Sequence, residues 1–97
     1  MVEHWQFDQG RDVVAITTRQ IMRDGHPVLS VIHYSEDQSW AFLSGHTFDP
    51  ADALAVRMQT VVDTDNTLHT IADLPPGWVA TRQSVGGEWH RHRDTEA

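Results

Sequence analysis

The chain has 97 residues, 39% of them hydrophobic, and a formal net charge of −7 with histidine counted as neutral. That length fits one domain around a single core. Cysteine is absent, which excludes disulfides, thiolate catalysis and cysteine-based zinc sites. Every basic residue is an arginine, so lysine Schiff-base chemistry is excluded as well. The acidic balance opposes binding to nucleic acid and to anionic membranes.

No apolar stretch has the length of a membrane span, and the first ten residues lack the basic and apolar regions of a signal peptide. We therefore expect a cytoplasmic protein that forms a single domain over residues 1–97. Residues 1–12 are mostly polar, so we expect a loosely packed segment that lays Trp5 and Phe7 on the domain surface. Residues 93–97 are expected to form a disordered tail.

Three strands are predicted in the first half of the chain. Residues 13–17 form a β-branched run, and residues 28–34 carry large apolar side chains on both faces, which predicts a central strand covered on each side. Residues 40–44 should return antiparallel after a polar loop. Between the first two strands, Thr17 or Thr18 can cap a helical turn through Ile21, which the Asp24-Gly25 dipeptide would end.

The main prediction for the segment from Asp49 to Val62 is a helix. Asp49 can cap it and Pro50 suits the first helical position. Its apolar residues then recur at helical spacing: Leu54, Met58, Val61 and Val62. In the alternative, residues 53–57 form a short strand and the helix begins near Met58.

A second short helix and a closing hairpin are predicted from residue 65 onward. Asp65 can cap the helix, and Pro75 and Pro76 would stop it because proline cannot continue the hydrogen-bond ladder. Residues 78–83 and 88–92 read as two strands joined by a tight turn at 84–87. The whole predicts an α+β fold: a mainly antiparallel sheet of about five strands, with one or two helices between the third and fourth strands.

Two short motifs support a resemblance that spans residues 28–89. They are Trp-x-Phe-Leu-x-Gly at 40–45 and Asp-Leu-Pro-x-Gly-Trp at 73–78, followed by a terminal strand that contains Trp89. With them the chain resembles a family of small uncharacterised bacterial domains that look like the immunity-type proteins of polymorphic toxin systems. The resemblance implies an α+β fold and a protein-binding role, and it carries over no catalytic residue.

The terminal strand offers the most suggestive spacing for a metal site. Residues two apart on a strand share a face, so Glu88, His90 and His92 could together hold a zinc ion. With water in an open position, the same set would suit a metal-dependent enzyme. The competing interpretation is a solvated edge strand, in which the histidines and the flanking arginines deter edge-to-edge pairing.

No residue pattern points to catalysis without a metal. Ser44 and His46 are neighbours on a loop, which rarely gives the geometry of a catalytic triad. His33 shares a face with Leu29 and Val31, so we expect a hydrogen-bonded core histidine.

We therefore predict first a non-enzymatic acidic domain that binds another protein, as immunity proteins do, and its acidity favours a basic partner. Tryptophan is a favoured interface anchor, and acidic side chains would attract a basic partner. The candidate contact residues are Glu36, Asp37, Trp5, Asp49 and Asp52. Metal binding through Glu88, His90 and His92 is the second hypothesis. Homo-oligomerisation is the third, because the predicted sheet leaves two strand edges exposed.

Overall fold

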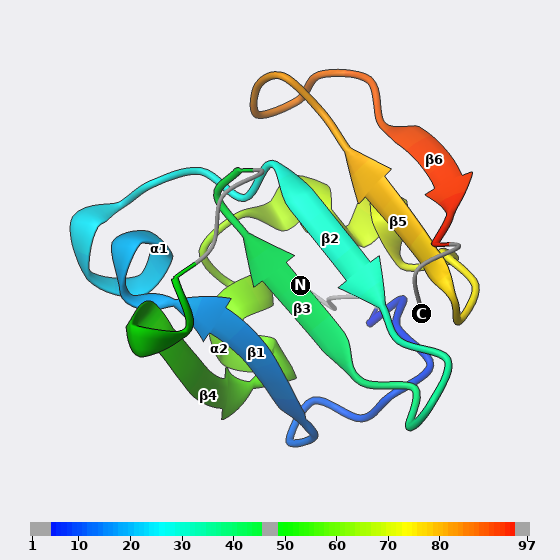
Figure 1. Cartoon of the computed structure of the whole chain (residues 1–97), viewed down its shortest axis with the longest axis horizontal. Helices are drawn as coiled ribbons and strands as arrows, with labels where there is room; N and C mark the ends of the chain where they lie inside the picture. Colours follow the sequence, from blue (N-terminus) through cyan, green and yellow to red (C-terminus); the bar gives the residue numbers. More distant parts are fainter. Residues whose placement is uncertain (1–4, 46–48, 95–97) are drawn as a thin grey trace.

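Six strands form one sheet in the order β4-β1-β3-β2-β5-β6 in the computed structural model (Figure 1), which describes residues 5–45 and 49–94. The strands are β1 (Val14–Thr18), β2 (Ser30–His33), β3 (Trp40–Leu43), β4 (Ala53–Arg57), β5 (Trp78–Thr81) and β6 (His90–Arg93). Two α-helices and two 3₁₀ helices accompany them: α1 (Arg19–Asp24), α2 (Met58–Val62), η1 (Pro50–Asp52) and η2 (Asn66–Ile71).

The fold is α+β, as predicted, and its sheet is mainly antiparallel. Within it, β1 and β3 pair in parallel, whereas the other four neighbouring pairs are antiparallel. The predicted strand count was one too low. Helix placement also differs, because α1 lies between β1 and β2, η1 between β3 and β4, and α2 and η2 between β4 and β5.

The missing strand is β4, which corrects the main interpretation of residues 49–62. Residues 53–57 are a strand and not the middle of a helix, because they form a ladder of five antiparallel pairs with β1. Leu54 and Val56 are partly buried, whereas their neighbours in β4 are exposed. The alternating burial shows that pairing with β1 overrides the helical spacing.

Local capping signals are confirmed where the helices are short. The Thr18 hydroxyl accepts a hydrogen bond from the backbone N–H of Ile21 and so caps α1. Gly25 ends α1 with a φ of 74°, a conformation that suits glycine. Asp65 caps η2 by accepting from the backbone N–H of Thr67.

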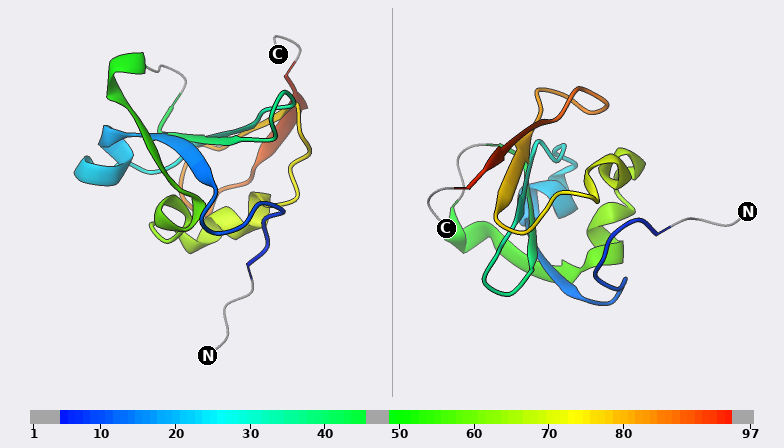
Figure 2. Two further views of the ribbon diagram at one scale, coloured as in Figure 1. Left: turned by 90° about the horizontal axis from the view of Figure 1, so that it is seen from below. Right: turned by 90° about the vertical axis from the view of Figure 1, so that its right-hand side faces the viewer.

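The hydrophobic core lies between one face of the sheet and the layer formed by α2 and η2 (Figure 2). The sheet supplies Ala15, Val31, Trp40, Phe42 and Ala80, and the helical layer supplies Met58, Val61, Val62, Leu68 and Ile71. Phe7 was expected on the surface. It is instead 5% exposed and its ring packs edge-on against the Trp40 ring, because the N-terminal segment closes one side of this core.

His33 is a core residue, as predicted. Its Nδ1 lies 2.7 Å from the carbonyl oxygen of Leu74, so Nδ1 carries the proton and donates it. Its ring stacks on Trp40 with centroids 3.9 Å apart. Through these two contacts, His33 links Trp40 at the start of β3 to the turn that precedes β5.

The radius of gyration is 12.4 Å, close to the value of about 12.5 Å that a compact domain of this length should have. None of the helices in the described residues has the length and apolar character needed to cross a bilayer.

Candidate functional site

The face of the sheet that points away from α2 and η2 carries no comparable helical layer, and of the described helices η1 lies on that side of the sheet (Figure 2). The pairing register aligns the side chains of this open sheet face in rows across all six strands. The middle row consists of Ala55, Ile16, Ala41, Ile32, Val79 and His92. Five consecutive apolar side chains, one from each of five neighbouring strands, therefore lie on the side of the sheet without helices.

Antiparallel sheets that face water on one side usually carry polar side chains there. The open sheet face departs from that rule because its middle row is apolar. Ile16, Ile32 and Val79 are partly buried and Val14 is 55% exposed, whereas Ala41 and Leu43 on the same face are buried. A contiguous apolar patch of this kind is typical of a surface that binds another molecule.

Hydroxyl groups and one histidine border the apolar row on one side. The next row along the strands contains Ala53, Thr18, Leu43, Ser30, Thr81 and His90. This row carries no acidic residue and mixes small, polar and apolar groups. A partner that lies on the middle row would find hydrogen-bonding groups along this border.

The opposite end of the open sheet face is acidic. The backbone of Tyr34 continues the β2–β3 pairing through Ser39, and Asp94 continues the β5–β6 pairing through Gly77. Burial raises the pKa of the Tyr34 hydroxyl, and the negative charges of Asp94 and Asp37 raise it further. Both carboxylates therefore lie near Tyr34, where they would attract a cationic group.

The residues of the predicted zinc site lie on or next to β6. His90 and His92 project from the open sheet face at its edge, whereas Glu88 precedes the strand. Within residues 5–45 and 49–94, no group of three histidine, aspartate or glutamate side chains is arranged to hold a metal ion. The structure thus does not bring Glu88, His90 and His92 together as a ligand set.

The arginines of β6 alternate with the histidines and point to the other face. Arg91 forms an ion pair of 2.8 Å with Asp73 and donates to the carbonyl oxygen of Thr70. The Arg93 guanidinium lies 5.9 Å from the centre of the Trp78 ring. These contacts attach β6 to the layer beneath, and its exposed sequence of arginine and histidine suits a protected sheet edge.

The predicted acidic contact residues fall at two separate corners of the fold. Glu36 and Asp37 are exposed in the β2–β3 turn, near the acidic end of the open sheet face. Hydrogen bonds from Ser39 lower the pKa of the Asp37 carboxyl. Asp49 and Asp52 belong to η1, at the opposite side of Figure 1.

The two aspartates at η1 contribute to the fold of the chain itself. Asp49 caps η1 by accepting from the backbone N–H of Ala51. Asp52 accepts a 2.8 Å hydrogen bond from Gln20 and lies 3.6 Å from the Arg19 guanidinium. These contacts anchor η1 to α1.

Trp5, the predicted aromatic contact residue, also packs within the chain. Its indole N–H donates to the carbonyl oxygen of Gln9 at 2.7 Å. Its ring lies against Phe7 and His69, with centroids 5.4 and 5.7 Å away. Ser44 is half-buried at the end of β3, and His46, its predicted neighbour, lies outside the described residues.

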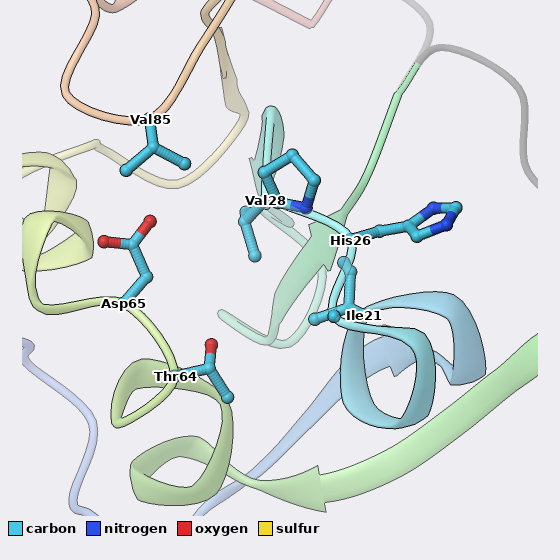
Figure 3. A pocket seen from close by; sticks show the side chains of 8 residues that line it. Ile21, His26, Val28, Thr64, Asp65 and Val85 are labelled. Carbon is cyan, nitrogen blue, oxygen red and sulfur yellow. The ribbon is translucent and has the colours of Figure 1, made fainter.

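A pocket of about 250 Å³ opens between α1, the segment before η2 and the β5–β6 turn (Figure 3). Its volume falls below the range of about 300–1,000 Å³ that is common for small-molecule sites. Ile21, Thr64, Asp65 and Val85 point toward it, whereas the His26 ring points away. The Asp65 carboxylate at its wall is already hydrogen-bonded, so the pocket has little free polar capacity.

Asp65 forms a buried ion pair with Arg82. The Arg82 guanidinium donates to Asp65 at 2.7 Å and to the Thr67 hydroxyl at 2.9 Å, and its Nε donates to the carbonyl oxygen of Val28. Burial of the Asp65 carboxyl opposes its ionisation. The hydrogen bonds from Thr67 and Arg82, together with the Arg82 charge, outweigh that effect and lower the pKa of Asp65.

Replacing Asp65 with asparagine should lower the free energy of unfolding, and the loss should be larger near neutral pH than in acid. Because the folded-state pKa is lowered, Asp65 contributes stability above its unfolded value of 3.8, and that contribution is lost as the pH falls through the folded value. Urea unfolding of wild type and Asp65→Asn at about pH 6 and about pH 3 tests this. We expect the stability difference between the two proteins to shrink at the lower pH. A difference that stays constant would contradict the role of this carboxylate.

Comparisons with known proteins found no match: no family model, curated protein or solved structure matches the chain. The resemblance to immunity-type proteins thus stays a prediction.

The open sheet face was not predicted from the sequence, although the sequence contains a signal for it. Residues 28–34 carry apolar side chains on both faces, and the sequence was interpreted as a strand covered on each side. α2, η2 and the N-terminal segment pack on the face that carries Val31 and His33. The other face, which carries Ile32, is where a covering element would lie.

Proposed function

We propose that the chain is a non-enzymatic protein-interaction domain that binds its partner on the open sheet face. The observation that carries this proposal is the apolar middle row, in which Ile32 and Val79 are neighbours and Ala41 separates Ile32 from Ile16. Removing such side chains from water is favourable by about 25 cal/mol per Å² of apolar area. The same side chains offer no nucleophile or acid–base group, so binding suits this face better than catalysis.

The dimensions of the face indicate the kind of element that covers it. Six strands about 4.8 Å apart, each about four residues long at about 3.3 Å per residue, give a plan area of about 400 Å². A standard interface buries about 800 Å² on each partner. The face is therefore matched to one amphipathic helix, about 10 Å in diameter, better than to a whole second domain.

The charge distribution indicates the chemistry of that partner. Glu36, Asp37 and Asp94 lie at one end of the face, and the chain has a net charge of −7. We therefore propose a partner segment with large apolar side chains and basic residues at one end, which the acidic end would attract. A cytoplasmic protein with the role of an immunity protein would find such a partner in a toxin, as the resemblance implies.

Replacing Val79 with lysine should abolish partner binding without unfolding the domain. Val79 is half-buried in the middle row, and a long lysine stem can carry its ammonium group from there to solvent. The charge would then lie where the partner needs apolar contact. We expect quantitative mass spectrometry of tagged protein, isolated from cells of the source species, to show the specific partner reduced about tenfold or more by Val79→Lys.

The matched control is Val85→Lys. Val85 is 53% exposed in the β5–β6 turn, away from the open sheet face, so the same change should leave partner recovery intact. Circular dichroism of both variants checks that they are folded. Equal recovery of the partner with wild type and with folded Val79→Lys would contradict the proposed function.

A further inference from the structure

The outer edge of β4 is a second unpartnered feature, and its Ala53 and Ala55 also belong to the open sheet face. β4 ends the sheet order and pairs only with β1, and Figure 1 shows no described element beyond it. A strand edge of this kind presents backbone donors and acceptors to any strand that can lie beside it.

The pairing register shows which residues direct their backbone groups outward. The N–H of Met58 donates to the carbonyl oxygen of Val13, so this is a hydrogen-bonded pair of the antiparallel ladder. Such pairs alternate with non-hydrogen-bonded pairs. Ala53, Ala55 and Arg57 therefore occupy the non-bonded positions, and their N–H and C=O groups point away from β1. The N–H of Ala53 is already used, because it donates to the carbonyl oxygen of Pro50.

The two edges of the sheet differ in how they are protected. β6 has the sequence His-Arg-His-Arg, fully exposed, which deters pairing through charge and bulk. β4 has the sequence Ala-Leu-Ala-Val-Arg, and its outward positions carry two alanines and one arginine. The β4 edge is thus the one that a further strand can approach closely.

We propose that two copies of the chain pair through β4 in an antiparallel arrangement about a two-fold axis at Ala55. This register is self-complementary. Ala55 lies opposite its own copy, Leu54 opposite Val56 of the second copy, and Ala53 opposite Arg57 of the second copy. No like charges face each other, and the Leu54–Val56 contacts extend the apolar core face across the junction.

The backbone groups also match in this register. Each Ala55 N–H donates to the Ala55 carbonyl oxygen of the other copy, and each Arg57 N–H donates to the Ala53 carbonyl oxygen. The Ala53 N–H is engaged with Pro50, so each Ala53–Arg57 pair forms one of its two possible hydrogen bonds. The two sheets become one continuous sheet, and both open sheet faces lie on the same side of the dimer.

A pair of glutamate substitutions tests this register. Ala55→Glu places two carboxylates opposite each other at the two-fold axis, so the dimer should dissociate. Ala53→Glu, at the same edge and on the same face, instead places its carboxylate opposite Arg57 of the second copy, so the dimer should persist. Sedimentation equilibrium of the full chain at micromolar concentration distinguishes the 11.0 kDa monomer from a species of twice that mass.

We expect wild type and Ala53→Glu to be dimers and Ala55→Glu to be a monomer with an unchanged circular dichroism spectrum. A monomeric wild type at these concentrations would overturn the proposal. So would dimers of equal strength in both glutamate variants, because they would show that the contact lies elsewhere. An Ala55→Glu variant that failed to fold would move the test to the cysteine variant described next.

A single cysteine gives the second readout, since the natural chain has none. Directly opposed residues of a hydrogen-bonded antiparallel pair have Cα atoms about 5.5 Å apart, within the range of a disulfide. Ala55→Cys should therefore form a covalent dimer on mild oxidation, whereas Val85→Cys should not. Equal crosslinking of the two variants would overturn the register. Val79→Lys lies on the open sheet face and should leave the dimer intact, so this test is independent of the proposed function.

Discussion

Replacing Arg82 with alanine is expected to lower the free energy of unfolding by about 3–5 kcal/mol, because the change leaves buried polar groups without a partner. The Arg82 side chain is fully buried, and three groups from two separate segments accept its hydrogen bonds. Its guanidinium also lies 4.3 Å from the centre of the Trp89 ring. Arg82 therefore holds the end of β5 against both η2 and the start of β2.

Urea unfolding of the full chain measures this loss, with Arg23→Ala as the control. Arg23 is exposed in the last turn of α1, so its replacement should cost less than about 0.5 kcal/mol. Arg82→Lys should remain well below wild type, because one ammonium group cannot reproduce the fixed geometry of the guanidinium. If Arg82→Ala lowered the free energy of unfolding by less than about 1 kcal/mol, the Asp65–Arg82 ion pair would contribute no more than an ordinary surface ion pair. That result would contradict its structural role.

Replacing Trp40 with alanine is expected to have an effect of similar size, about 3–5 kcal/mol. Trp40 is completely buried, and its ring contacts His33, Phe7 and Phe42. Its indole N–H donates to the side chain of Gln9 at 2.6 Å. The substitution would leave a large cavity between β3 and the N-terminal segment. Because small domains are stable by only about 5–15 kcal/mol, it should remove much of the total.

Trp40→Phe separates the aromatic contacts from the hydrogen bond. Phenylalanine keeps part of the stack on His33 but cannot donate to Gln9, so we expect a loss of about 1–2 kcal/mol. Thermal unfolding followed by circular dichroism ranks the three proteins. If Trp40→Ala were as stable as Trp40→Phe, the aromatic cluster would contribute little and the role given to it would be wrong.

The strands and caps were predictable because each has a local signal. The β-branched runs marked β1 and β2, and Thr18, Asp49 and Asp65 all cap helices as their side chains suggest. Residues 53–57 show the limit of such signals. Alanine and leucine favour a helix, and only the ladder with β1, a segment about forty residues earlier, makes them a strand.

The candidate sites were harder to predict, because they depend on contacts between distant segments. Nothing local shows that Arg82 is buried beside Asp65, seventeen residues earlier in the chain. The apolar residues of the middle row are visible in the sequence, but their lack of cover depends on where α2 and η2 lie. The His-x-His spacing at 90–92 was the most conspicuous pattern, and the structure places both histidines on one face of β6.

The open sheet face is tested most directly by its contacts inside the cell. A photo-crosslinking amino acid at position 79 would lie in the middle row, and one at position 85 would lie in the β5–β6 turn. We expect irradiation of living cells to attach one specific protein through position 79 and not through position 85. Crosslinks of equal yield at both positions, or none at position 79, would contradict the assignment of this face as the binding surface.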